Sequence, residues 1–370
     1  MFRTAALLLP LFLVLGLTIT GCKSLGPGAL REGRTSYNEA VRQTADQELL
    51  LNIVRLRYRE TPSLLTVNNI AVQMSWETKQ RGVINFLPST ADGYNLQSEL
   101  NIYERPTIAY RPVVGQAFVE QMLRPVNETN IVLLYNAGWP VDTLFGLTVQ
   151  SINGVDNAPG APSELTDAFE VVDGRVTRFN KFQRLILDLR TLQRASRLSL
   201  GAGGAGGFTQ ARIDQGGDTA AAAQRVVKTL RLEAKAPLFD LGQATEPGRK
   251  NRTSIAVVTR SLMSTLFFLS QGVHVPENDV EAGRVPVPRD DAGQALEQGA
   301  ETQGLFTVHH ADRRPRDAYA AVSHRGRWFY IDDADLPSKT TFSLLSQLFA
   351  MQAGQLKNAG PLLTLPVGGG

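Results

Sequence analysis

The chain has 370 residues, of which 43% are hydrophobic and 20% are charged, and its formal net charge is +3 at pH 7. This composition is typical of a globular protein rather than a disordered stalk, and the length suffices for one large domain or two ordinary ones. A charge so close to zero gives no reason to expect a nucleic-acid partner. Because the chain has one cysteine, it cannot form an internal disulfide, and the fold must rest on core burial.

The first 21 residues have the pattern of a secretory signal peptide. Arg3 supplies a positive charge, residues 5–19 are mostly apolar, and small residues precede Cys22. The apolar stretch covers about fifteen residues, whereas a membrane-spanning helix needs about 20. The pattern therefore favours a cleaved leader over a permanent transmembrane helix.

The residues Ile19-Thr20-Gly21-Cys22 resemble the lipobox of bacterial lipoproteins, in which an aliphatic and two small residues precede a cysteine. The resemblance implies that diacylglycerol alkylates the thiol of Cys22, that the leader is cut before it, and that the new amino terminus is acylated. An ordinary leader with a chance cysteine is the alternative. Lys23 follows the cysteine where Asp would favour retention, which implies transfer to the outer membrane under enterobacteria-like sorting.

The first half of the mature chain predicts helices and strands in alternation. Residues 22–34 contain glycine and proline and predict a flexible tether. Ser36 and Glu39 have the spacing of a capping box, which predicts a helix from about 37 to 58. Further elements are expected as strands in 63–76, 100–110 and 147–152, helices over 113–123 and 130–137, and a turn at Asn153-Gly154.

A longer helix is expected from about 175 to 198, and its composition allows two interpretations. Phe182, Leu185 and Leu189 belong to an apolar stripe, while basic residues flank that stripe. In the first interpretation this is a core helix whose arginines extend their charged ends to water. In the second, the basic residues of Arg175–Arg197 bind lipid headgroups or an acidic partner.

Residues Gly201–Gly207 satisfy the G-x-G-x-x-G pattern without its context. The dinucleotide fingerprint needs a strand before it and a helix after it, and here a predicted helix precedes. We therefore predict no cofactor and interpret 200–207 as a Gly-rich linker. The resulting organisation is a signal peptide over 1–21, a tether over 22–34, subdomains over 35–199 and 208–356, and an extended tail over 357–370.

The second half predicts an α+β arrangement, so the fold class expected for the chain is α+β with mixed helices and antiparallel strands in one large or two smaller subdomains. Residues 277–303 are charged, rich in glycine and proline, and read as a long loop. The other expected elements are helices over 219–230, 261–271 and 338–353 (the last capped by Ser338), a strand over 254–259, and a hairpin of 318–323 and 327–331 about Arg325-Gly326.

No catalytic or metal-binding residue can be assigned from the sequence. The four histidines, His274, His309, His310 and His324, lack zinc-ligand spacing, and neither a nucleophile elbow nor a P-loop is present. Asp332-Asp333-Ala334-Asp335 lacks the glycine and distal glutamate of a calcium loop and reads as a solvated turn. The basic residues of 313–316 read as a solvated loop.

Residues 47–62 (QELLLNIVRLRYRETP) and 361–368 (PLLTLPVG) resemble segments of uncharacterised proteobacterial lipoproteins, a resemblance that brings no assigned activity. Our leading hypothesis is an outer-membrane-anchored, periplasm-facing lipoprotein that serves as a scaffold or interaction module of a cell-envelope assembly. Its expected partners are the lipid bilayer, through acylated Cys22, and envelope proteins. The alternative is an anchored periplasmic hydrolase or ligand-binding protein whose site forms only on folding.

Overall fold

The computed structural model describes most of the chain after residue 26. The described residues are 27–63, 65–85, 93–112, 116–157, 171–172, 175–176, 178–202, 209–233, 236–243, 252–287, 297–353 and 363–366. They form an α+β fold with mostly antiparallel strands, which confirms the fold class predicted from the sequence. The chain divides into two compact units, Met1–Gln47 and Glu48–Gly370.

Helix α2 (Pro27–Arg57) crosses the division between these units. It begins at Pro27, within the expected tether and well before the predicted cap at Ser36. Proline suits the first helical turn because its missing N–H would have no partner there. Glu39 does not close a capping box but accepts hydrogen bonds from the side chains of Arg42 and Gln43. In the second unit, Leu50, Ile53 and Val54 of α2 are fully buried.

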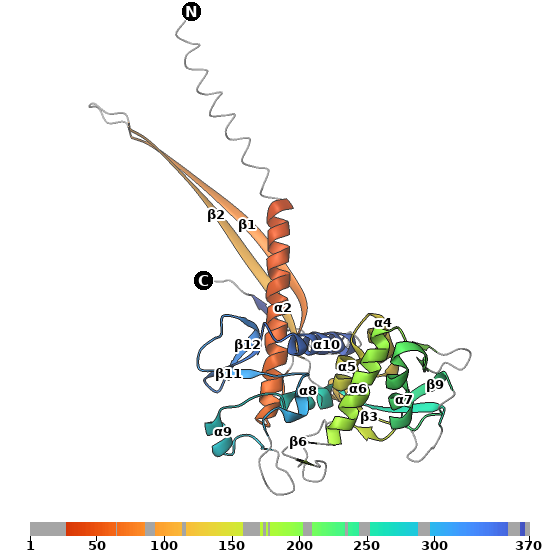
Figure 1. Ribbon diagram of the computed structural model, residues 1–370. Coiled ribbons are helices and arrows are strands. Elements are labelled where there is room, and N and C mark those ends of the chain that lie inside the picture. The colour runs from red at the N-terminus through yellow and green to blue at the C-terminus, as the bar shows by residue number, and fades with distance from the viewer. Residues whose placement is uncertain are drawn as a thin grey trace, which may run out of the picture. The chain divides into compact units, whose positions relative to one another are not determined.

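Two long strands form a hairpin arm, β1 (Leu65–Asn85) and β2 (Gly93–Pro112), as Figure 1 shows. The predicted strands were placed in this region but were much shorter. Strand β14 (Leu363–Pro366), from the expected extended tail, pairs with β2 at Thr107–Tyr110. The sheet therefore has the order β1-β2-β14, with the last strand covering only a short part of β2.

A six-stranded sheet forms the centre of the second unit, in the order β4-β3-β10-β9-β8-β7. Only β9 and β10 are parallel. Strands β7 and β8 lie on either side of the predicted Gly-rich linker and pair antiparallel in this one sheet, with Gly201 and Ala202 inside β7. The segment therefore connects adjacent strands and does not separate two subdomains. The bounds are β3 Val149–Ile152, β4 Val155–Asp156, β7 Leu198–Ala202, β8 Thr209–Ile213, β9 Leu238–Gln243 and β10 Ser254–Thr259.

The turn predicted between β3 and β4 is confirmed. Asn153 and Gly154 have φ angles of 47° and 75°, a left-handed conformation that asparagine and glycine tolerate best. The Asn153 side chain donates to the carbonyl of Leu230 and accepts from the amide of Ala256, at 2.8 and 2.7 Å. This residue thereby ties the turn to the neighbouring strand and to the end of a helix.

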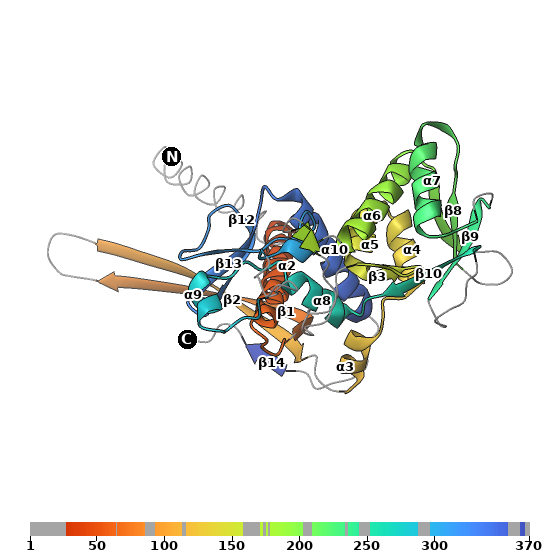
Figure 2. The same cartoon turned by 60° about the horizontal axis from the view of Figure 1, so that its bottom comes forward.

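Helices cover one face of the six-stranded sheet. Figure 2 shows α5 (Val141–Thr148) and α6 (Arg178–Arg194) over the sheet, with α7 (Ala220–Thr229) beside α6. On β8, Ala211 and Ile213 are buried and Arg212 between them is exposed, so one face of the sheet meets the helices and the other meets solvent. The shorter elements nearby are α3 (Gln116–Leu123), α4 (Glu128–Asn136), η3 (Gly217–Thr219), β5 (Val171–Val172) and β6 (Arg175–Val176).

A smaller antiparallel sheet has the order β11-β13-β12. Its predicted hairpin turn is confirmed, since Arg325 and Gly326 both have positive φ angles, 50° and 77°. The expected long loop 277–303 contains a helix, α9, and a short helical turn, η4. The elements here are β11 His309–Ala311, β12 Ala318–His324, β13 Arg327–Asp332, α8 Leu262–Ser270, α9 Glu277–Glu281, η4 Ala300–Thr302 and α10 Leu336–Ala353.

The apolar side chains of these elements form one continuous core, which includes Ile53 of α2, Phe182 of α6, Phe329 of β13 and Leu345 of α10. The second unit therefore has a single core that extends from the six-stranded sheet to the smaller one. Within the described ranges, no helix is both long and apolar enough to cross a membrane.

Candidate functional site

Helix α6 is the basic helix expected over 175–198, and the structure shows which of its sides is buried. Phe182, Leu185, Leu189 and Leu192 are all buried, which confirms that its apolar stripe faces the core. Lys181 and Arg184 lie on its exposed side. The two interpretations of this helix are therefore compatible, because one side packs and the other presents charge.

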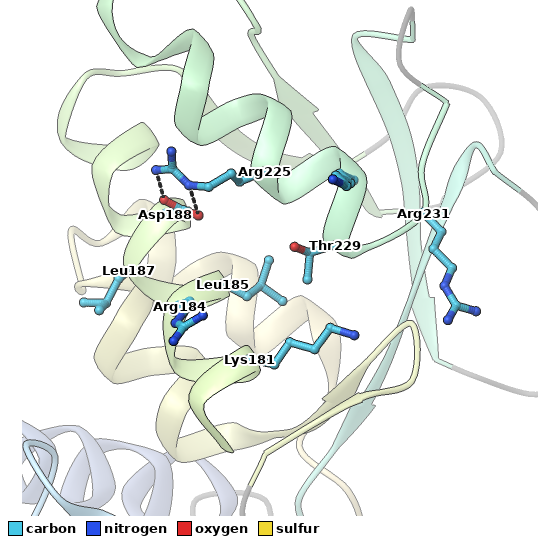
Figure 3. A pocket seen from close by; sticks show the side chains of 9 residues that line it. Lys181, Arg184, Leu185, Leu187, Asp188, Arg225, Thr229 and Arg231 are labelled. Atoms are coloured by element: carbon cyan, nitrogen blue, oxygen red, sulfur yellow. Dashed lines mark hydrogen bonds and ion pairs between the residues drawn. The ribbon is translucent and has the colours of Figure 1, made fainter. Parts of the chain in front are cut away.

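An open groove lies between the exposed sides of α6 and α7, and its volume is about 930 Å³. Figure 3 shows the ion pair of Arg225 and Asp188 at one end, with Leu185 and Thr229 between this pair and Lys181. The full set of lining residues contains five cations and one carboxylate: Lys181, Arg184, Leu185, Leu187, Asp188, Arg225, Lys228, Thr229 and Arg231.

Small residues on α7 allow the two helices to pack. Ala222 and Ala223 are buried together with Val226 and Val227, so the apolar side of α7 is mostly short side chains. Residues three apart on a helix share a face, which places Arg225, Lys228 and the following Arg231 along the groove.

The one carboxylate of the groove is already paired. Nε of Arg225 donates to Oδ2 of Asp188 at 3.0 Å, and Nη2 donates to Oδ1 at 2.5 Å. This hydrogen bonding to Asp188 raises the pKa of Arg225 above its ordinary value. The two-point geometry is the one that guanidinium groups prefer with carboxylates.

Four further cations line the groove: Lys181, Arg184, Lys228 and Arg231. Among the described residues, no carboxylate forms an ion pair with Lys181, Arg184, Lys228 or Arg231. Lys181 lies in the first turn of α6, which contains no acidic residue, and positive charge at a helix amino end opposes the helix dipole. Helix stability therefore does not explain Lys181, and an anionic group placed in this groove would meet several cations that no described carboxylate pairs with.

The sequence indicates one wall of this groove but not the other. The basic composition of α6 is visible in the sequence, but Arg225, Lys228 and Arg231 come from an Ala-rich helix about forty residues later in the chain. Their spacing of three residues was the available signal. That the two rows face each other follows from tertiary packing, which no local pattern contains.

The predicted lipidation site lies outside the described residues. Ile19, Thr20, Gly21 and Cys22 all belong to this part of the chain. Lipid attachment therefore stays a prediction from the sequence.

Three of the histidines lie near one another. The rings of His274 and His309 are 5.7 Å apart, and the ring of His309 lies 5.6 Å from that of Tyr330. His310 is the next residue of β11. Within the described ranges, no cluster of three histidine, cysteine, aspartate or glutamate residues could hold a metal ion.

The acidic cluster forms a turn and a helix cap. Asp332 accepts a hydrogen bond from the amide of Ala334, and Asp335 accepts one from the amide of Ser338 at 3.1 Å. The predicted cap at Ser338 is therefore wrong, since α10 begins at Leu336 with Asp335 before it. Ser338 is buried and its hydroxyl oxygen accepts from the amide of Thr307 at 2.8 Å.

The basic loop 313–316 is exposed at Arg313, Arg314 and Arg316. The guanidinium of Arg314 lies 5.5 Å from the ring centroid of Trp328, within the range of a cation–π contact. The groove of α6 and α7 is the stronger candidate site because its cations come from two packed helices and line one open volume.

No protein-family model, no curated protein and no solved structure matches the chain. The chemistry of the groove and the pattern of the leader are therefore the observations from which a function can be inferred.

Proposed function

We propose that this chain is an outer-membrane-anchored, periplasm-facing lipoprotein that acts as an interaction module of a cell-envelope assembly. The observation that carries the proposal is the groove of α6 and α7, where Lys181, Arg184, Lys228 and Arg231 have no charge partner among the described residues. We propose that an acidic segment of a partner protein binds there.

The groove suits an extended acidic segment in shape and chemistry. Its cations come from two helices, so a bound chain would meet positive charge on both sides. Leu187 is 59% exposed at the groove and offers an apolar contact between the charges. The internal pair of Asp188 and Arg225 is an example of the same recognition within the chain.

Acyl chains on Cys22 would keep this groove close to a bilayer. Each buried methylene contributes about 0.8 kcal/mol to membrane binding, and stable anchoring needs more than a single acyl chain. The three chains implied by the lipobox meet that condition. A permanently anchored body with a basic groove fits a role in assembly at the membrane.

A charge-reversal experiment tests this proposal. Lys181→Glu with Lys228→Glu reverses one cation on each wall of the groove, and Arg212→Glu with Arg316→Glu is a matched control at exposed positions outside it. We expect the lipidated full-length chain, purified from detergent-solubilised membranes, to recover a stoichiometric acidic partner. The groove variant should lose that partner, whereas the control should keep it. Equal recovery by both variants, or a chain without partners in every detergent, would contradict the proposal.

A second candidate function is the binding of a small anionic ligand. The groove volume of about 930 Å³ lies within the range of about 300–1,000 Å³ that small-molecule sites occupy. Calorimetric titration with inorganic phosphate and with citrate distinguishes the two functions. The ligand-binding function would be favoured if either anion binds, if Lys181→Glu with Lys228→Glu abolishes that binding, and if the chain recovers no partner protein.

A further inference from the structure

The hairpin arm has long strand edges with no strand beside them in the described part of the chain. Strand β1 has 21 residues and is an outer strand of its sheet, and β2 has 20 residues but is paired with β14 only at Thr107–Tyr110. Strands of globular proteins usually have 3–10 residues. At about 3.3 Å per residue, each strand extends about 65 Å, most of it with an open edge.

Open edges expose unpaired backbone N–H and C=O groups, which form a template for another strand. Proteins usually protect such edges with short strands, bulges, prolines or charged residues, and β1 carries charged residues only in its second half, at Glu77, Lys79 and Arg81. Strand β1 contains no proline, and its one register shift lies near its start, between Val67 and Asn69. From Asn69 to Asn85 the edge of β1 is therefore regular.

The register of the arm concentrates apolar residues at the positions of one face and polar residues at those of the other, although Gln80 and Glu104 belong to the first face and Tyr103 to the second. From Asn69 onward every cross-strand pair joins residue numbers of equal parity, such as Trp76 with Ile102 and Lys79 with Glu99. Even-numbered positions of both strands therefore share one face and odd-numbered positions share the other. The even positions include Ile70, Val72, Met74, Trp76, Leu96, Leu100 and Ile102, and the odd positions include Gln73, Glu77, Lys79, Arg81, Gln97, Glu99, Asn101 and Arg105.

We propose that the arm joins copies of this chain, with the outer edge of β2 in one copy pairing antiparallel with the outer edge of β1 in a second copy. At the register found inside the hairpin, this contact would repeat the same residue pairs. Lys79 would again lie opposite Glu99, and Trp76 would lie opposite Ile102. The division into an apolar and a polar face would continue from one copy to the next, which a one-residue shift would destroy.

The backbone geometry is consistent with this register. In an antiparallel pair of strands, hydrogen-bonded and non-hydrogen-bonded residue pairs alternate. The backbone N–H and C=O groups of the non-hydrogen-bonded residues therefore point away from the partner strand, toward the outer edge of the hairpin. The same residue pairs can therefore meet at the outer edges of two copies. Pairs that are non-hydrogen-bonded inside the hairpin become hydrogen-bonded between copies, and the reverse. Because β14 covers Thr107–Tyr110, the available part of β2 is Gly93–Pro106. The contact uses two different edges, so it is head-to-tail and produces a ring or a filament.

Mixed single-cysteine variants test this contact in the full-length chain. The only native cysteine is Cys22, whose thiol is blocked if it is lipidated as proposed. Two differently tagged copies, one with Ser75→Cys and the other with Tyr103→Cys, are expressed together and mildly oxidised in the membrane. The mixture of Thr78→Cys and Leu100→Cys examines the other kind of residue pair. We expect at least one mixture to give a covalent dimer that carries both tags.

An out-of-register mixture is the control. Gln97 lies opposite Arg81, so the mixture of Ser75→Cys and Gln97→Cys separates the thiols by six positions, about 20 Å along the strands, beyond disulfide reach. Ser75→Cys with Tyr103→Cys in one chain should form an internal disulfide, which reports that the hairpin has folded. An internal disulfide without intermolecular dimers would overturn the proposal, and so would a yield of dimer in the control equal to that of the in-register mixtures. Linkage to a different protein, or failure of the internal disulfide to form, would also overturn it.

Discussion

At the residue scale, Arg260 shows how a buried cation holds two helices together. It is 0% exposed, and its Nη1 donates to the carbonyl oxygens of Gly146 and Leu147 at 2.9 and 3.1 Å. Its guanidinium also lies 4.0 Å from the ring centroid of Phe268. The residue thus connects the last turn of α5 with α8, and burial lowers its pKa.

Arg260→Met should destabilise the protein because it leaves buried carbonyl oxygens without their donor. We expect the free energy of unfolding to fall by about 3 kcal/mol, the size typical of a broken buried polar contact. Urea denaturation of residues 23–370, expressed without the leader, measures this. Arg212→Met at an exposed position is the control and should change the value by less than about 0.5 kcal/mol. Equal effects of both substitutions would contradict the assigned role.

The partly buried histidines predict a pH dependence of stability. Burial lowers the pKa of His310, with a further contribution from the charge of Arg327, and burial together with His309 lowers that of His274. As the pH falls below about 6.5, the unfolded chain binds protons that the folded chain does not, so the free energy of unfolding should decrease. His310→Gln should reduce this slope between pH 7.5 and 5. An unchanged slope would show that His310 titrates alike in both states.

At the element scale, the sequence predicts elements whose local signals and packing agree. The apolar spacing of α6 and the turns at Asn153-Gly154 and Arg325-Gly326 were correctly interpreted. The sequence predicts β1 and β2 too short because residues 77–85 and 93–99, next to the hairpin turn, are mostly polar, which is also the pattern of exposed chain. The sequence predicts neither strand β9 nor helix α5, because both are short and carry a weak local pattern.

The end of α2 is held by hydrogen bonds between residues that lie far apart in the sequence. Tyr58 is buried, and its hydroxyl donates to Oδ2 of Asp279 at 2.7 Å, while Arg284 donates to Oδ1 at 2.5 Å. Burial and this hydrogen bond raise the pKa of Tyr58, so it remains a donor. Burial alone would raise the pKa of Asp279, but the bonds from Tyr58 and Arg284 hold it below its ordinary value.

Tyr58→Phe removes this donor and leaves the ring in place. We expect the free energy of unfolding to fall by about 1–3 kcal/mol, because a charged acceptor in a buried site loses a hydrogen bond. Tyr319→Phe is the matched control, since the Tyr319 hydroxyl forms no hydrogen bond with the residues that the structure describes. Thermal unfolding of both variants measures the difference. A smaller loss for Tyr58→Phe than for the control would contradict this account.

At the scale of the whole molecule, the sequence did not reveal how its halves combine. Gly-rich residues 200–207 suggested a linker, yet β7 and β8 on either side are neighbours in one sheet. The groove likewise needs α6 and α7, which that expected boundary would have separated. Composition identifies glycine-rich chain, but only strand pairing decides whether it connects two domains or two strands.

Membrane attachment is predicted to depend on one residue. Cys22→Ala removes the thiol that diacylglycerol would alkylate, so an uncleaved or mislocalised precursor is expected. Fractionation and mass spectrometry of the cell envelope measure both outcomes. Wild-type processing and wild-type membrane location of this variant would refute lipid attachment.

The central claim is that the groove of α6 and α7 recruits an acidic partner at the membrane, and photo-crosslinking in living cells tests it most directly. A photoreactive phenylalanine analogue replaces Leu187 in the groove, or Arg212 outside it as the control. We expect a discrete crosslinked product, containing an acidic envelope protein, from position 187 alone, and its loss when Lys181→Glu and Lys228→Glu are added. No product from position 187, or the same product from position 212, would contradict the claim.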